Sequence, residues 1–512
     1  MFDRDLRRCL TAPITTRIES RTSTEEQTIV KLELSRRRLI HMGAAGLLPT
    51  LLSAGCANTA IDAVGALDTQ VTGPISGGDK GWIYRSPVLD LDALGYVMEE
   101  FFVSGTARSF KLADGAETSF DGEWRTEPDL ASPFTTRIFI LRPADPAKYN
   151  GVLLAHWQNV SAGYENGYPT GDEIFKGYAW MGVSAQADGI YGTPRTRPYS
   201  LKEWDSARYG ELNHPGDAFS YDIYAKSVSA ALARSAKARG GSLANLKTKS
   251  VIAMGGSQSA WRLATYINAV HPHQKIFNGF LLLSHFGVAM PLSEPSIPQL
   301  LGPAGNGRSG GSCQIRATSD APVLAIGSQA EALTRFPARQ PDTDTFRSWE
   351  VAGAPHAPPS TMAMKNLTLE RDGIPLPGGA DQNIVEWGYV VDAGIRKLAK
   401  WIDTGEAPPQ FPPISIVLKD GRPTFETDAA QNVLGGIRPP EVAAPVGVHT
   451  AALTKLLGHS ELFGEPRMLE LHGSRERFLA SWNEAVDVLV RADLLEPEQE
   501  GPIRAHASDF WK

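Results

Sequence analysis

The chain has 512 residues, 42% of them hydrophobic, which is enough apolar sequence for a large core and excludes wholesale disorder. Its formal net charge is −7, and residues 1–55 hold nine basic and six acidic side chains, so the rest of the chain lacks the basic face that nucleic-acid binding requires. Only Cys313 lies beyond residue 56, which excludes an intrachain disulfide framework there, and no Cys/His cluster indicates a structural zinc.

The N-terminal segment, residues 1–56, has the pattern of an export signal. Arg36 and Arg37 begin a run that resembles a twin-arginine signal, and the apolar stretch after it is too short to span a membrane. The stretch ends in LLSAGC, which resembles a lipobox with Cys56 as the lipidated residue. We therefore expect export to the periplasm and a lipid anchor at Cys56. The alternative is a basic run ahead of a buried helix.

The body alternates strand-like and helix-like segments. Apolar runs bounded by turn signals are typical of strands buried on both faces, and apolar residues at helical spacing predict helices. Strands are expected at 95–110, 134–143, 151–157, 177–186, 249–255, 277–287, 321–328 and 345–353, and helices at 217–238, 259–270 and 383–405. This alternation predicts an α/β fold with a mostly parallel central sheet flanked by helices.

Two further regions complete the predicted organisation around a catalytic domain at 75–405. Residues 288–320 are rich in Pro, Gly and Ser and are long for a structureless connection, which predicts a lid-like insertion. Residues 406–512 are predicted to form a C-terminal helical extension packed on the catalytic domain, with VLVRADLL as an amphipathic example.

The stretch MGGSQSAWR, residues 254–262, lies between a predicted buried strand and a predicted helix. A strand–turn–helix elbow exposes a serine and places a helix N-terminus beside it. The residues two positions away must be small: Ser257 has Gly255 and Ser259 there, whereas a Ser259 nucleophile would have Trp261. We predict Ser257 as the nucleophile. The alternatives are Ser259, or a helix-capping serine without chemistry.

A serine nucleophile needs a base and an acid that orients the base. His356, in WEVAGAPHAPP, follows the last predicted strand and is the expected base; His285, at an earlier strand end, is the weaker candidate. Glu331 follows the strand at 321–328 and is the expected acid. Asp342 and Asp344, in the next polar loop, remain alternatives.

The expected oxyanion donors are the backbone N–H groups of Gln258, Asn159 and Val160, the last two in the loop HWQNVSAGYENG at 156–167. Core packing is the alternative role for each aromatic residue assigned to the substrate pocket. The residues assigned to that pocket are Trp157, Tyr164, His285 and Phe286, with Tyr168 and Trp261 as further candidates. His214, Asp217 and Asp222 form either a metal or acid–base cluster or, as we expect, the capped start of a helix.

Several motifs in a fixed order extend across residues 80–505: HWQNVSAG, GYAWMGVSAQADGI, RYGELNHPGDAFSYDIY, GGSQSAWRLATYINAVHP, GSQAE, WEVAGAPH and QNVLGGIRPPEV. In these motifs the chain resembles the bacterial "alpha/beta hydrolase domain" family of esterase-like proteins. The resemblance implies the alpha/beta-hydrolase fold, ester hydrolysis and the triad Ser257, Glu331 and His356. His156 stands where an acidic residue is common in the family, and Glu331 where an aspartate is common.

Together these features predict an exported serine carboxylesterase that acts on a small-molecule ester through an acyl-enzyme, with no cofactor and no metal. The same machinery would serve an amidase, lactonase or thioesterase. A non-catalytic envelope lipoprotein that binds a small ligand on a hydrolase scaffold is the alternative from another class. The sequence does not predict the oligomeric state.

Overall fold

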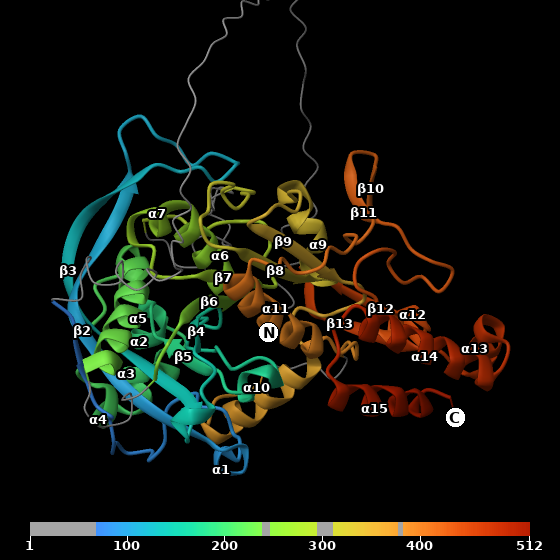
Figure 1. Ribbon diagram of the computed structural model, residues 1–512, viewed down its shortest axis with the longest axis horizontal. Coiled ribbons are helices and arrows are strands. Elements are labelled where there is room, and N and C mark those ends of the chain that lie inside the picture. Colours follow the sequence, from blue (N-terminus) through green and yellow to red (C-terminus); the bar gives the residue numbers. More distant parts are fainter. Residues whose placement is uncertain (1–67, 238–245, 294–310, 377–381, 512) are drawn as a thin grey trace, which may run out of the picture. The chain divides into compact units, whose positions relative to one another are not determined.

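Nine strands form one sheet in the order β1-β2-β3-β5-β4-β6-β7-β8-β9 (Figure 1). The computed structural model describes residues 68–237, 246–293, 311–376 and 382–511, all of which belong to a single unit at 58–512. The predicted export signal with Cys56 lies outside the described residues, as does the middle of the predicted lid, residues 294–310. None of the helices in the described ranges is both long enough and apolar enough to span a membrane.

The strands fall into an antiparallel part and a parallel part. The antiparallel strands are β1 (Gln70–Thr72), β2 (Tyr96–Leu112) and β3 (Thr126–Pro143). The pairing of β3 with β5 is also antiparallel. The parallel strands are β4 (Val152–Trp157), β5 (Ala179–Val183), β6 (Ser250–Gly256), β7 (Gly279–Leu283), β8 (Val323–Ser328) and β9 (Phe346–Val351). The mostly parallel α/β fold expected from the sequence is confirmed.

Each parallel strand is buried on both faces because successive side chains point to opposite sides of the sheet. In β7, Phe280 and Leu282 join one core cluster, whereas Leu281 and Leu283 join the other. The first cluster packs under α5 (Ser220–Lys237) and α6 (Gln258–Thr265), and the second under α11 (Gly388–Thr404) and the C-terminal helices. This double burial explains why the strands read as continuous apolar runs.

The helices expected at 217–238 and 383–405 are present, and the helix expected at 259–270 ends in a π-turn at Tyr266–Val270, whereas the helices at Gln329–Arg335 and Pro359–Arg371 are not among the expected ones. The longer helices are α5 (Ser220–Lys237), α6 (Gln258–Thr265), α9 (Gln329–Arg335), α10 (Pro359–Arg371) and α11 (Gly388–Thr404). Short helices are α1 (Leu91–Leu94), α2 (Ala187–Tyr191), α3 (Leu201–Trp204), α4 (Ser206–Tyr209) and α7 (His271–Gln274).

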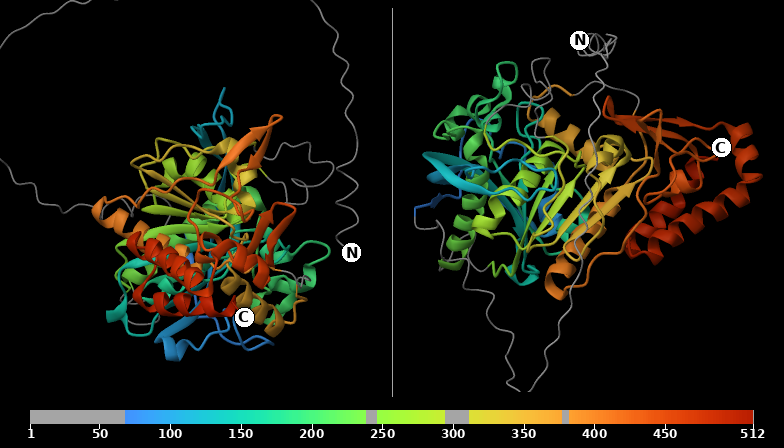
Figure 2. Two further views of the ribbon diagram at one scale, coloured as in Figure 1. Left: turned by 90° about the vertical axis from the view of Figure 1, so that its right-hand side faces the viewer. Right: turned by 90° about the horizontal axis from the view of Figure 1, so that it is seen from above.

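The C-terminal residues are partly helical and partly β-structure. The helices are α12 (Pro440–Ala443), α13 (Glu465–His472), α14 (Arg475–Arg491) and α15 (Pro497–His506). Two hairpins that the sequence analysis missed are β10 (Ile416–Lys419) with β11 (Arg422–Phe425), and β12 (Gly447–Ala452) with β13 (Lys455–Leu462). Figures 1 and 2 show this orange-to-red region beyond β9, where Ile437 bridges to Val351.

Candidate active site

Ser257 occupies the sharp turn between β6 and α6. Its backbone has φ 57° and ψ −122°, and a positive φ is unusual for a residue with a side chain. Its N–H donates to the carbonyl of Leu283 at the end of β7, 2.9 Å away. Backbone strain of this kind is typical of functional turns. The turn after β6 places Ser257 at the carboxyl edge of the sheet.

Ser259 is fully buried and its hydroxyl closes the turn. The Oγ atom donates to the carbonyl of Gly256 at 2.8 Å and accepts from the N–H of the same residue at 2.9 Å. A hydroxyl held in this way is not presented to a substrate. In the structure Ser257 is the serine at the turn, and its role as the nucleophile stays a prediction.

Gly255 shows why the residue two positions before the turn must be small. A Cβ atom there would lie 2.9 Å from the backbone carbonyl carbon of Ser259 and 3.1 Å from a methyl carbon of Leu263. The chain cannot relax this contact cheaply because the nearest atom belongs to the backbone of α6. The glycine therefore allows the helix to approach the strand.

His356 follows β9, and its Nδ1 atom hydrogen-bonds Oε1 of Glu331. Glu331 is fully buried, whereas the His356 side chain is 13% exposed. The carbonyl of His356 accepts from the hydroxyl of Ser284 at 2.6 Å. Ser284 directly follows Leu283, the partner of the Ser257 N–H, so Ser257 and His356 flank the carboxyl end of β7.

Glu331 has a second role at the start of α9. Its Oε2 atom accepts from both the N–H and the hydroxyl of Ser328, each at 2.8 Å, in a capping box. The alternative acids have other surroundings: Asp342 accepts from the N–H of Ser348 at 3.0 Å, and Asp344 is exposed. Glu331 is thus the carboxylate that the structure brings to His356.

His285, the weaker candidate base, is buried and its Nε2 atom bonds the carbonyl of Val288 at 2.8 Å. Burial, reinforced by the charge of Arg335, lowers the pKa of His285 to about 3. Burial also lowers the pKa of His156, the departure from the family pattern, to about 3. Both imidazoles are therefore neutral at ordinary pH.

The loop after β4 lies against the elbow. The Asn159 side-chain amide donates to the carbonyl of Gly256 at 2.9 Å, and the N–H of Val160 points to Oε1 of Gln258 at 3.4 Å. Among the described residues, the backbone N–H groups of Asn159 and Gln258 have no acceptor. Of the three expected oxyanion donors, these two therefore make no hydrogen bond within the described residues, whereas the Val160 N–H donates to Gln258.

A buried polar network that the sequence analysis did not identify fixes Gln258. Its Nε2 atom donates to Oε1 of Gln186 at 3.0 Å, and Gln186 donates onward to Asp217 at 3.2 Å. Asp217 also accepts from Arg262 at 2.6 Å. Burial would raise the pKa of Asp217, but Arg262 and the neighbouring donors hold it below its usual value. The residues are far apart in sequence, so no local motif marks them.

Of the aromatic residues assigned to the substrate pocket, Phe286 lies beside the candidate base and Trp157 does not. The Phe286 ring centroid lies 5.3 Å from that of Trp261, edge to face, and 5.4 Å from that of His356, so Phe286 is beside the candidate base. Trp157 is wrong as a pocket residue: it is fully buried, packs on Tyr224 and donates its indole N–H to Gln186. The alternation in β4 turns Trp157 toward the α5 side of the sheet, together with the other odd-numbered residues of that strand.

Tyr164 and Tyr168 lie in the same loop as Asn159, and both rings face the Arg85 guanidinium, at 5.8 and 5.0 Å. Among the described residues, neither tyrosine makes a ring contact or hydrogen bond with His356. Their neighbourhood is instead a set of buried charges behind the loop.

Of the three residues His214, Asp217 and Asp222, the first two lie close enough for His214 to help lower the pKa of Asp217, whereas Asp222 has other partners. His214 bonds the carbonyl of Ala185 at 2.9 Å, whereas Asp222 accepts from the N–H of Arg108 at 2.6 Å. Within the described ranges no group of three His, Cys, Asp or Glu side chains could hold a metal ion. Asp217 opens the turn before α5, which agrees with the expected helix start.

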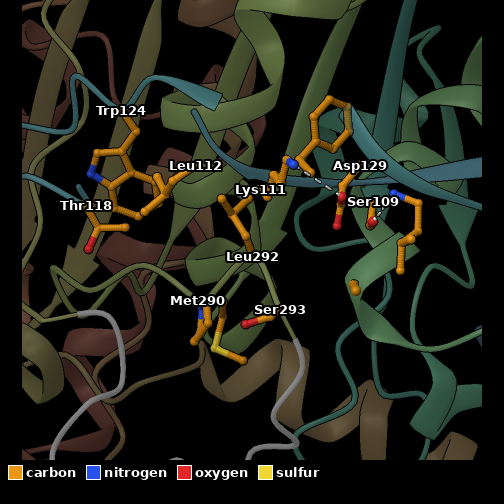
Figure 3. Close-up of a pocket in the computed structure, with 13 residues that line it drawn as sticks. Ser109, Lys111, Leu112, Thr118, Trp124, Asp129, Met290, Leu292 and Ser293 are labelled. Atoms are coloured by element: carbon orange, nitrogen blue, oxygen red, sulfur yellow. Dashed lines mark hydrogen bonds and ion pairs between the residues drawn. The ribbon is translucent and has the colours of Figure 1, made fainter. Parts of the chain in front are cut away.

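A cavity of about 490 Å³ lies away from these residues (Figure 3). It is lined mainly by apolar side chains of β2, β3, the loop between them and the segment before residue 294, among them Leu112, Trp124 and Leu292. Lys111 pairs with Asp129 at its rim. A second cavity of about 540 Å³ lies between α10, α11 and α15. Neither is lined by Ser257, Glu331 or His356.

A family model described as "Alpha/beta hydrolase domain" matches residues 71–505. Similar solved structures include a fungal esterase from Rhizomucor miehei, with 10% identity, TM-score 0.25, and coverage of 53% of this chain and 84% of that one. An S-formylglutathione hydrolase from Agrobacterium tumefaciens has 10% identity, TM-score 0.27, and coverage of 56% and 96%. A glucuronoyl esterase from Solibacter usitatus has 10% identity, TM-score 0.25, and coverage of 60% and 86%. A search of curated protein sequences found no match.

Proposed function

Because the chain belongs to the alpha/beta hydrolase domain family, we propose that it is a serine hydrolase that cleaves carboxylic esters through an acyl-enzyme. The observation that carries the proposal is the buried Glu331 carboxylate on Nδ1 of His356, next to a strained serine turn at the same sheet edge. A serine is a weak nucleophile alone, and this arrangement supplies the base and its orienting acid.

The proposed reaction has two steps. The Ser257 hydroxyl attacks the ester carbonyl carbon while its proton passes to Nε2 of His356, the ring nitrogen that Glu331 leaves open. The carbon–oxygen bond to the alcohol then breaks, and the imidazolium returns the proton to the departing alcohol. In the second step water attacks the acyl carbon while His356 takes a proton from it. The bond between that carbon and Oγ of Ser257 then breaks, the imidazolium returns the proton to Oγ, and the acid is released.

The backbone N–H groups of Gln258 and Asn159 hold the negative oxygen in both tetrahedral intermediates. Gln258 opens α6, so its N–H has no partner inside the helix and the helix dipole adds to the stabilisation. The Glu331 carboxylate stabilises the imidazolium and fixes the tautomer with the proton on Nδ1.

The experiment is labelling of the purified protein with a fluorophosphonate, followed by mass spectrometry of the labelled peptide. We expect the label on the peptide that contains Ser257, its loss in Ser257→Ala and a large reduction in His356→Ala. Folded wild-type protein that takes up no label would overturn the proposal and favour a ligand-binding role. Labelled protein would next be given aryl esters, lactones, amides and thioesters to rank the acyl substrates.

We further propose that residues 1–56 direct export to the periplasm and that Cys56 carries a lipid. The support is the twin-arginine pattern and the LLSAGC sequence. Cell fractionation tests it: Cys56→Ala should move the protein from the membrane fraction to the soluble periplasm. Wild-type protein found in the soluble fraction would contradict the anchor, and protein retained in the cytoplasm would contradict export.

A further inference from the structure

Two fully buried guanidinium groups, from Arg85 and Arg137, hold the distal end of the loop at 158–168. The near end of this loop carries Asn159, whose side chain binds the elbow at Gly256. The two ends are joined directly, because the N–H of Asn166 donates to the carbonyl of Asn159 at 2.8 Å. Whatever fixes Asn166 therefore also fixes the peptide next to the proposed oxyanion donor.

Arg85 clamps the loop through its backbone and a side chain. Its Nε atom donates to the carbonyl of Glu165 at 3.1 Å, and Nη2 donates to Oδ1 of Asn166 at 3.3 Å. From the other side, Asp372 lies 3.5 Å from Nη1 and accepts the Arg85 N–H at 3.2 Å. Arg85 has a left-handed φ of 56°, so the surrounding bonds hold it in a costly backbone conformation.

Arg137, on β3, supplies the second attachment. Its Nη2 atom pairs with Oε2 of Glu165, and Nη1 donates to Glu100 at 3.1 Å. Burial alone would lower the pKa of Arg137, but the facing carboxylates of Glu165 and Glu100 raise it, so the group stays charged. Gly189 makes room for Glu165, since a Cβ atom there would lie 2.9 Å from the Glu165 side chain.

Stability alone is a poor reason for such an arrangement. Buried ion pairs cost desolvation free energy that their attraction often fails to recover, and apolar replacements are commonly neutral or stabilising. Oε1 of Glu165 and Nη1 of Arg85 also lack hydrogen-bond partners among the described residues, so the cluster is not fully satisfied. What the cluster does achieve is a single fixed position for the loop backbone.

We propose that Arg85 and the Glu165–Arg137 pair are positioning residues that hold the Asn159 N–H in line with the Gln258 N–H to form the oxyanion hole. The proposal rests on the proposed serine-hydrolase function. Oxyanion stabilisation depends on donors within a few tenths of an ångström of the required place, and a displacement of about 1 Å can cost about 100-fold in rate.

Arg208→Gln is the matched control. Arg208 is a buried guanidinium of the same network and pairs with Glu100 at 2.6 Å. Its other side-chain hydrogen bonds go to the carbonyls of Gly77 and Ile75, and it makes none to the loop at 158–168. Loss of Arg208 therefore disturbs the buried charges without releasing the loop.

The experiment compares wild type with Arg85→Gln, Glu165→Gln and Arg208→Gln in four measurements: kcat and KM on an activated aryl ester, the fluorophosphonate labelling rate, the inhibition constant of an alkyl boronic acid, and Tm. For Arg85→Gln and Glu165→Gln we expect kcat and the labelling rate to fall about 10- to 100-fold with KM within about 2-fold. The boronate, which forms a tetrahedral adduct, should lose affinity by a similar factor. Arg208→Gln should lower Tm while kcat stays within about 3-fold.

Three results would overturn the positioning role: boronate affinity unchanged in Arg85→Gln and Glu165→Gln, a normal labelling rate in every variant, or a fall in kcat that follows Tm equally in all three variants. Where Arg85→Gln does not fold, Arg85→Lys replaces it, because an ammonium keeps the charge but cannot span both loop acceptors; we expect it to lie between wild type and Glu165→Gln. Wild-type protein that neither hydrolyses the ester nor takes the label overturns the proposed function itself, whereas normal labelling in every variant overturns only the positioning role.

Discussion

The Nδ1 atom of His356 hydrogen-bonds Oε1 of Glu331, while the other oxygen of the same carboxylate caps α9 through Ser328. The side chain proposed to orient the base is thus itself fixed by the first turn of a helix. The charge of Glu331 acts on His356, whereas its second oxygen caps the helix. A substitution that keeps the shape but removes the charge therefore tests the two functions separately.

Glu331→Gln tests the charge. Glutamine keeps the shape of the side chain, and its amide oxygen can still accept from Ser328. It carries no charge to stabilise the imidazolium of His356. We therefore expect kcat on an activated ester to fall about 10³-fold or more. Steady-state kinetics with Tm checks this. Asp342→Asn, which neutralises the alternative acid but keeps an acceptor for Ser348, should leave kcat near wild type. A larger loss in Asp342→Asn than in Glu331→Gln would reverse the assignment.

Ser259→Ala separates the two serines of the elbow. The substitution removes both bonds between Ser259 and Gly256 in a buried turn, and we expect a loss of about 1–3 kcal/mol in the free energy of unfolding. Fluorophosphonate labelling should persist, because Ser257 remains. Urea denaturation and peptide mapping give the two readings, and loss of the label in folded Ser259→Ala with retention in Ser257→Ala would mean the opposite register.

Gly255→Ala and Gly256→Ala test the packing of the elbow. A methyl group at Gly255 would press on the backbone of α6 at 2.9 Å, whereas at Gly256 the nearest atom is a carbon of Leu283 at 3.8 Å. We expect Gly255→Ala to cost about 1–3 kcal/mol of stability and to slow labelling, because the turn must move. Gly256→Ala should do neither to a comparable extent. Equal losses in the two variants would show that the close approach of α6 is not what the glycine serves.

The parallel strands and the strand–turn–helix elbow at Ser257 could be predicted from the sequence because both follow from local physics, whereas the nucleophilic role of Ser257 stays a prediction. Buried strands are short apolar runs, and a tight turn admits only small neighbours such as Gly255. Trp157 was assigned wrongly because an aromatic residue beside a loop resembles a pocket residue. The environment of Trp157 depends on which side chains of β4 point toward α5, and this is fixed by the tertiary structure.

The support behind the candidate site could not be predicted in the same way. Arg85 meets Glu165 across 80 residues of sequence, and Arg137 meets Glu165 across 28. Neither arginine stands in a recognisable motif, so the sequence predicts an ordinary exposed side chain for each, whereas both are buried in the fold. The hairpin β12–β13 was missed because KLLGHSEL carries no clean alternation of apolar and polar residues.

Glu441, in α12, gives a prediction about pH and stability. Burial raises the pKa of Glu441 to about 7, from an ordinary value near 4.5. The folded protein therefore keeps this proton at pH values where the unfolded chain has lost it, so the contribution is full below about pH 4.5 and is lost as the pH rises through about 7. The shift corresponds to roughly 3 kcal/mol between the two limits.

Glu441→Gln should remove this dependence, because a glutamine stays neutral at every pH and can occupy the same buried position. We expect the free energy of unfolding of the variant to gain on that of wild type between pH 5 and pH 8, by up to about 3 kcal/mol. Urea denaturation at several pH values measures it. Glu461→Gln, at an exposed position of β13, is the control and should follow the wild-type curve. Parallel curves for wild type and Glu441→Gln would mean that Glu441 is already ionised in the folded protein at neutral pH, and that the surrounding groups stabilise its charge.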